Sequence, residues 1–200
     1  MSGKGSDLNN HHARKVLTIL TAGIICLVAA IGVYAWDISS ATETIDWELT
    51  LTRSNGVQLI LSYDEIKAMP SYEGRGGFFT SVGVVNGPYR VKGVPVVALC
   101  DAVGGVSPSD IVYVFATDGY SAVFDYEQIM GDMDTYDPET MKLVSHEELK
   151  VLLEYEQDGK ALSHDYGKPL RLAIAGEESL LTEGHHWVKW INKIEIINID

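Results

Sequence analysis

The sequence predicts an α+β, mainly β domain preceded by one transmembrane helix. Strand patterns outnumber helical patterns along the chain and do not alternate with them, which argues against an alternating parallel sheet. Apolar residues make up 46% and charged residues 22% of the 200-residue chain. That composition is globular, and the length fits one ordinary domain with an appendage. Residues 16–36 form an uncharged run that does not fit a water-facing domain.

The uncharged run is long enough to cross a bilayer once. As a helix its 21 residues would span roughly 30 Å, which is about the thickness of the hydrocarbon layer. Arg14 and Lys15 stand directly before it, and the positive-inside rule places such a flank in the cytoplasm. We therefore expect anchorage in the cell membrane through this helix.

This topology divides the chain into four parts. We expect a cytoplasmic tail at residues 1–15, an anchor at 16–36, a linker at 37–44 and a domain at 45–200 outside the cytoplasm. Cleavage as a secretion signal is the alternative, because Val33 and Ala35, on either side of Tyr34, make a passable cleavage site.

The first elements of the domain are a hairpin and a short helix. Apolar and polar residues alternate at 47–51 and again at 57–61, and Asn55 and Gly56 between them are a strong turn signal. Ser62 with Glu65 makes a capping-box pattern, so a helix is expected up to the proline at position 70.

Turn residues and apolar runs delimit the remaining elements in the same way. The predictions, in chain order, are a flexible glycine stretch at 74–77, a β-rich run at 78–85, a helix at 95–103 ended by two glycines, a strand at 111–117, a turn at 118–119, a strand at 120–124, an acidic surface insertion at 131–140, and strands at 152–156, 170–175 and 194–199.

The charge balance limits the partners. The chain carries 15 Lys and Arg against 28 Asp and Glu, a net charge of -13, and residues 37–200 hold 27 of the acidic residues. Such a surface disfavours nucleic acid, and it would hold an anionic ligand only where basic side chains gather. Cys26 lies in the apolar run and Cys100 in the domain, so we expect no internal disulfide and interpret Cys100 as a packing residue on a helix.

Known metal and catalytic motifs are not matched. Asp132 and Asp134 resemble the start of a calcium-binding loop, but Asp137 stands at the glycine position and Leu143 at the position of the bidentate glutamate. A solvated loop is the better interpretation. The pair His185 and His186 is expected to point to opposite faces of a strand, and no nucleophile elbow or phosphate-binding glycine loop occurs.

Four segments in order resemble one family. They are residues 92–96 (KGVPV), 118–120 (DGY), 158–171 (DGKALSHDYGKPLR) and 187–196 (WVKWINKIEI). Together they look like the molybdopterin-binding domain of sulfite oxidase-type oxidoreductases, and the resemblance covers residues 45–197. It implies the mainly β, mixed-sheet fold of that family and a cofactor that is molybdopterin or another pterin.

The resemblance also implies a set of cofactor-binding residues. Arg171 and Lys189 match basic positions of the family, and His164 lies close to a family histidine but is offset. We expect Arg171 and Lys189 to converge on one anion site; structural ion pairing is the alternative. The rim of that site would be the turn of Asp118, Gly119 and Tyr120 or the loop that contains Ser81.

The metal ligand of the family is missing. Its members carry a cysteine thiolate for molybdenum in the loop before the Gly-Val-Pro segment, and residues 78–90 contain no cysteine. Ser81 is the nearest substitute, and Cys100 follows that segment. Two functions therefore stay open: a membrane-anchored oxidoreductase or redox-associated domain, and a non-catalytic relative that binds a pterin or small anion or serves in protein interaction.

Overall fold

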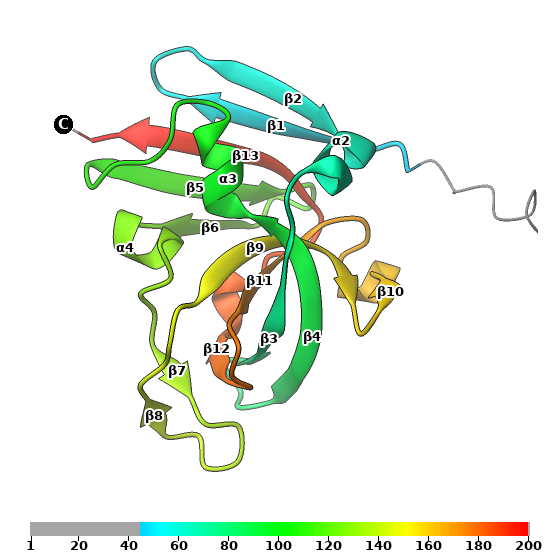
Figure 1. Ribbon diagram of the computed structural model, residues 1–200, viewed down its shortest axis with the longest axis vertical. Helices are drawn as coiled ribbons and strands as arrows, with labels where there is room; N and C mark the ends of the chain where they lie inside the picture. Colours follow the sequence, from blue (N-terminus) through cyan, green and yellow to red (C-terminus); the bar gives the residue numbers. More distant parts are fainter. Residues whose placement is uncertain (1–44, 200) are drawn as a thin grey trace, which may run out of the picture. The chain divides into compact units, whose positions relative to one another are not determined.

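Two sheets make up the part of the chain that the computed structural model describes, residues 45–199 (Figure 1). This part belongs to a compact unit, Ile45–Asp200. The first sheet contains, in order across it, β2 (Gln58–Ser62), β1 (Glu48–Arg53), β13 (Ile191–Asn198), β5 (Asp110–Ala116) and β6 (Ser121–Phe124). β1 runs parallel to β13 and the other pairs are antiparallel, so the sheet is mixed, as the resemblance implied.

The second sheet curves below the first in the view of Figure 1. Its strands are, in order, β10 (Lys160–Ala161), β9 (Lys150–Gln157), β4 (Val85–Pro95), β3 (Tyr72–Phe79), β12 (Leu181–Glu183), β7 (Thr135–Tyr136) and β8 (Leu143–Val144), and β11 (Arg171–Ala175) pairs with β9. β12 is parallel to β3, so this sheet is mixed as well. The other predicted strands are confirmed with shifted ends, but the β-rich run predicted at 78–85 is wrong: only its ends lie in strands, and residues 80–84 form the turn between β3 and β4.

Helices are few and short in residues 45–199. They are α2 (Tyr63–Ala68), α3 (Val96–Asp101), α4 (Tyr126–Ile129) and the 3-10 turns η1 (His164–Tyr166) and η2 (Gly184–His186). The predicted capping box is confirmed, because the Ser62 hydroxyl accepts the Glu65 N–H while the Glu65 carboxylate accepts the Ser62 N–H. None of the helices in the described region is long and apolar enough to cross a membrane. The tail, the anchor and the linker predicted for residues 1–44 lie outside the described residues.

The core follows from strand alternation on one sheet and full burial on the other. β5 alternates strictly between buried and half-buried side chains, with Val112 and Val114 on the buried side. β11 is buried at every position because it is covered on both faces, so its sequence has no alternation to read. Cys100 is 1% exposed in the same core cluster, which confirms it as a packing residue.

The glycines predicted to be flexible lie inside a strand. Residues 74–77 are in β3, and a Cβ on Gly76 would lie 2.0 Å from the carbonyl oxygen of Ile174. Glycine is required there because the β11 backbone packs directly against it. The error has a physical reason: glycine permits close packing as well as flexibility, and the neighbouring residues do not distinguish the two.

The acidic insertion at 131–140 is partly built into the fold. Met133 and Thr135 are buried, and β7 inside the insertion pairs with β12 and β8. Asp132 and Asp134 between them are exposed. Buried and exposed side chains therefore alternate through residues 131–135, with the carboxylates of Asp132 and Asp134 facing solvent.

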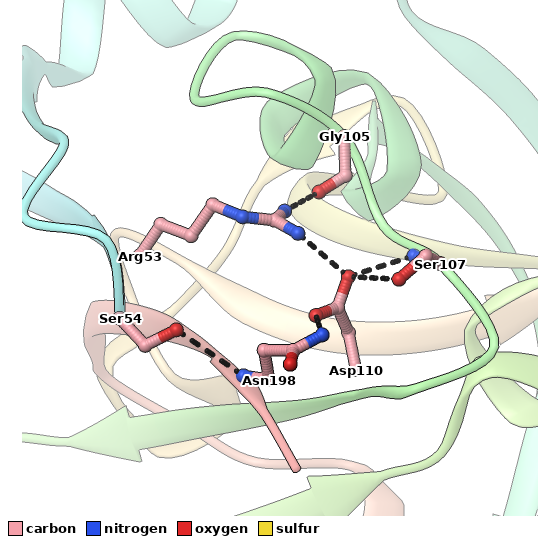
Figure 2. A network of polar contacts seen from close by, with 6 residues as sticks. All are labelled: Arg53, Ser54, Gly105, Ser107, Asp110 and Asn198. Atoms are coloured by element: carbon pink, nitrogen blue, oxygen red, sulfur yellow. Dashed lines mark hydrogen bonds and ion pairs between the residues drawn. The ribbon is translucent and has the colours of Figure 1, made fainter. Parts of the chain in front are cut away.

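A polar network fastens the strand ends of the first sheet (Figure 2). The guanidinium of Arg53 donates to Asp110 Oδ2 at 2.8 Å and to the carbonyl oxygen of Gly105. Ser107 donates to the same carboxylate through its N–H and its hydroxyl, and Asn198 donates to Oδ1 at 3.1 Å. Burial alone would raise the pKa of Asp110, but these hydrogen bonds outweigh it and hold the pKa below its ordinary value.

Candidate functional site

A surface groove lies between the β3–β4 turn, the β5–β6 turn and η2. It consists of two adjoining cavities of about 480 and 380 Å³ that share Phe78, Thr80, Tyr120 and Gly184 as lining residues. We call it the Lys189 groove, because Lys189 is the one lysine or arginine among its lining residues. Cavities of this size accept ligands of drug or cofactor-fragment dimensions.

The β3–β4 turn supplies hydroxyl groups to the groove. The Thr80 hydroxyl accepts the backbone N–H of Val84 at 3.1 Å, and the Thr80 carbonyl accepts the N–H of Gly83 at 2.8 Å. These bonds close the turn and leave Ser81 exposed at its tip, lining the larger cavity. The predicted Ser81 loop is therefore at the rim of the groove.

The β5–β6 turn forms another rim. Gly119 has a φ of +89°, a conformation that glycine adopts without strain, and the N–H of Tyr120 donates to Asp118 Oδ1 at 3.0 Å. The Tyr120 hydroxyl donates to the carbonyl of His185 at 3.1 Å, which ties this turn to η2. Asp118 and Tyr120 both line the groove, and the carboxylate of Asp118 is already engaged by its own turn.

Aromatic side chains form much of the groove wall. The rings of Phe78 and Trp187 are 5.0 Å apart, and the indole N–H of Trp187 donates to the Thr182 hydroxyl at 2.9 Å. Lys189 Nζ lies 5.9 Å from the ring of Trp190 and donates to the carbonyl of Asp165. A lysine held beside aromatic faces is suited to an anionic ligand that also has a planar ring.

Arg171 points into the protein instead. Its guanidinium donates through Nε to Glu154 Oε2 at 2.8 Å and through Nη2 to Gln157 Oε1 at 2.8 Å, and Nη2 lies 2.6 Å from the same Glu154 oxygen. Both members of the pair are at most 1% exposed. Burial raises the pKa of Glu154 to about 7, although Arg171 acts in the opposite direction.

The backbones of Arg171 and Lys189 lie side by side, but their side chains do not converge on one site as expected. The two residues form an isolated antiparallel bridge, yet Arg171 is not among the lining residues of the groove. Its guanidinium carbon lies 5.1 Å from the ring of Trp187, so it stands behind the aromatic wall. Arg171 Nη1 and Glu154 Oε1 are buried without a hydrogen-bond partner. For Arg171 the geometry matches the alternative, a structural ion pair.

His164 lies beside the groove rather than in it. It is exposed in η1, with its ring 5.6 Å from the ring of Trp190 and its Nδ1 3.8 Å from Asp165 Oδ1. It does not line either cavity of the groove. The groove therefore gathers Ser81, Asp118, Tyr120 and Lys189 from the predicted set, with Gly119 inside the turn.

Two groove residues carry no functional signal in the sequence. Phe78 and Thr80 look like ordinary strand residues when each is taken alone, whereas Trp187 and Trp190 lie in the segment at 187–196 that carries the family resemblance. His185 was expected to point away from His186, but both lie in a 3-10 turn and their rings are 3.8 Å apart. Alternation does not apply to a turn, which explains that error.

No thiolate is available in the groove. Cys100 is the cysteine of the described region, and burial raises its pKa to about 12. It lies in α3 and lines neither groove cavity. Within residues 45–199 no three His, Cys, Asp or Glu side chains are placed to hold a metal ion.

The fold is a mixed-β domain with a surface groove, and comparison with known proteins gives its family. The family model of the oxidoreductase molybdopterin binding domain matches residues 36–200, so the chain belongs to that family. The structure is similar to that of the sulfane dehydrogenase SoxCD from Paracoccus pantotrophus, with a TM-score of 0.59 and 18% sequence identity. The similarity covers 76% of this chain and 38% of that one, and it shows a shared fold. No curated protein matches the sequence.

The groove fits the organic part of such a cofactor better than a thiolate-bound metal. The aromatic rings of Phe78 and Tyr120 can contact a planar heterocycle, and Lys189 can pair with a phosphate. Ser81, which the resemblance gives as the nearest substitute for the family's metal-binding cysteine, lines the groove with a hydroxyl group. The residues present therefore offer contacts to a pterin and a phosphate, and no soft sulfur donor for molybdenum.

Proposed function

We propose that this chain is a membrane-tethered member of the family whose domain lies outside the cytoplasm and binds a pterin phosphate, molybdopterin or a relative, in the Lys189 groove. One observation carries the proposal: the groove combines a single lysine with aromatic walls in a chain of net charge -13. A domain of that charge repels anions except where a cation is fixed in place.

Each part of the groove has a distinct role in this proposal. Lys189 supplies the charge-assisted hydrogen bond to the phosphate, and its contact with Asp165 holds the ammonium at the rim. Tyr120, fastened to η2, contacts the planar ring. Thr80 and Ser81 offer hydroxyl groups to the polar edge of the ligand. A bound molybdenum cofactor would supply redox chemistry of its own.

Membrane attachment rests on the sequence. Residues 16–36 carry no charge and follow a basic flank, so the domain is placed outside the cytoplasm by the positive-inside rule. Protease added to intact spheroplasts should degrade the domain. Protection until lysis would contradict this orientation, and a mature N-terminus near position 36 would indicate a cleaved signal instead.

Calorimetric titration with a pterin phosphate tests the groove. The wild type should bind, and Lys189→Ala should bind at least about tenfold more weakly, because a charged hydrogen bond contributes roughly 1.5–3 kcal/mol. Lys142→Ala is the matched control, since Lys142 is exposed and lies outside the groove. Equal binding by all three proteins, or none by the wild type, would reject the proposal.

Metal analysis separates the two functions left open by the sequence. The purified full chain is assayed for molybdenum while its organic cofactor is extracted in parallel. A pterin without stoichiometric molybdenum would support a binding role. Molybdenum at one equivalent would contradict the reading of the groove as lacking a metal ligand and would assign the chain to the oxidoreductases.

A further inference from the structure

A second cavity, of about 390 Å³, lies between α4, the turn after it and η2. Its acidic lining residues are Asp125, Glu127, Asp132, Asp134 and Glu183. No lysine or arginine is among the lining residues. We call it the acidic cavity; it shares Glu183 and His185 with the Lys189 groove but has no lysine comparable to Lys189 among its lining residues.

Three of these carboxylates have no partner within residues 45–199. Asp125 caps α4 by accepting the N–H of Gln128, and Glu183 lies 3.1 Å from a ring nitrogen of His185. Glu127, Asp132 and Asp134 make no side-chain hydrogen bond or ion pair in that part of the chain. All three are exposed at the cavity, so a cationic ligand that enters it would meet three unpaired carboxylates.

A buried histidine supplies an independent indication of a ligand. His186 lines the same cavity, is 8% exposed, and packs its ring 5.0 Å from Phe124. Neither ring nitrogen has a hydrogen-bond partner among residues 45–199. Burial and the neighbouring His185 lower the pKa of His186 to about 4, so at neutral pH the ring is uncharged and one nitrogen can accept a hydrogen bond. No ring nitrogen of His186 is among the fully enclosed, unpartnered atoms of the described residues, so a donor inside the cavity can reach it.

The geometry selects among cations. Within the described residues no three acidic or histidine side chains converge closely enough to hold a metal ion, so a compact ion would not satisfy the cavity. A longer molecule with separated ammonium groups would. The buried thioether of Met133 on the cavity wall suits the methylene chain of such a molecule.

We propose that the acidic cavity binds a small aliphatic diamine or polyamine, with its ammonium groups on Glu127, Asp132 and Asp134 and one N–H donated to His186. This site contains none of the side chains assigned to the pterin ligand, although the two cavities adjoin at Glu183 and His185. The apolar part of the amine lies against Met133.

Titration of the full chain with putrescine and with spermidine tests the proposal, in about 150 mM salt to suppress non-specific attraction. The wild type should bind one molecule, and the variant Asp132→Asn with Asp134→Asn should bind at least about tenfold more weakly. The control Glu139→Gln with Glu177→Gln removes the same charge from exposed positions elsewhere and should bind like the wild type. The neutral analogue 1,4-butanediol should not bind.

His186→Gln is the second variant, because it keeps an acceptor but moves it. It should weaken amine binding while an unchanged melting curve shows that the domain is folded. Equal weakening by the control pair would reduce the effect to overall charge and overturn the proposal. So would absence of amine binding, or binding of zinc or calcium ions that putrescine does not displace. Lys189→Ala should leave amine binding unchanged, so the two sites can fail separately.

Discussion

Breaking the buried pair of Arg171 and Glu154 should cost far more stability than breaking an exposed pair. Removal of one member of a buried ion pair leaves an uncompensated charge and costs about 3–5 kcal/mol. Both side chains are at most 1% exposed, so water cannot take the place of the missing partner. For a domain of this size the loss corresponds to a fall in melting temperature of about 6–20 °C.

The experiment is a double-mutant cycle on the domain of residues 45–200. Arg171→Met and Glu154→Leu are each measured by denaturant unfolding at pH 8, then combined. The combined variant should regain most of the loss, because well-packed apolar residues can replace a buried pair at little cost. Arg90→Met is the control; its pair with Glu73 is exposed, so little change is expected.

The pH dependence of stability has a definite sign in the wild type and in Arg171→Met. In the wild type the pKa of Glu154 is raised from 4.5 to about 7, so its contribution to stability is complete below 4.5 and is lost as the pH rises through 7. Arg171 opposes that rise, so Arg171→Met should extend the loss to pH values above 7. Unchanged stability of this variant, together with lost binding of a pterin phosphate, would refute the reasoning and make Arg171 a ligand group.

Three other perturbations test separate features. Asp110→Asn should flatten the acid end of the curve of stability against pH. The pKa of Asp110 is lowered in the folded state, so the stability that this carboxylate contributes is present above its ordinary pKa of 3.8 and is lost as the pH falls through the folded pKa. A variant that keeps the wild-type slope in acid unfolding experiments would contradict this. Cys100 in the domain of residues 45–200 should react with a thiol reagent at pH 8 about 10,000-fold more slowly than a free thiolate would, and rapid native labelling would show that it is not buried. Ser62→Ala should cost about 1 kcal/mol by loss of the α2 cap, with Ser81→Ala as a neutral control for stability; equal melting temperatures would count against the cap.

Local patterns were enough to predict much of the fold. The hairpin of β1 and β2 follows from alternation around Asn55 and Gly56, and α2 follows from Ser62 and Glu65, because each depends on neighbours within a few residues. The rim residues Ser81, Asp118 and Tyr120 were found through the family resemblance, and the structure places them around one groove.

The orientation of Arg171 required the tertiary structure. The antiparallel register of β9 and β11 sets it directly opposite Glu154, 17 residues away in the chain, and the shared burial of these strands turns the guanidinium inward. The local sequence would be the same if this arginine faced outward. Gly76 shows the same dependence, because only the position of β11 reveals that its missing Cβ is needed for packing.

The sequence by itself determined the family, the strand-rich fold, the acidic charge and the lack of a cysteine in the segment before the Gly-Val-Pro motif. These properties are written in residue identity and short-range spacing. The tertiary structure decided which charges meet: Lys189 lines the groove, Arg171 pairs with Glu154, and Asp132, Asp134 and His186 surround a second cavity. The physical reason is that charge pairing and burial depend on distances between segments far apart in the chain, which strand register and turn geometry set and local sequence does not encode.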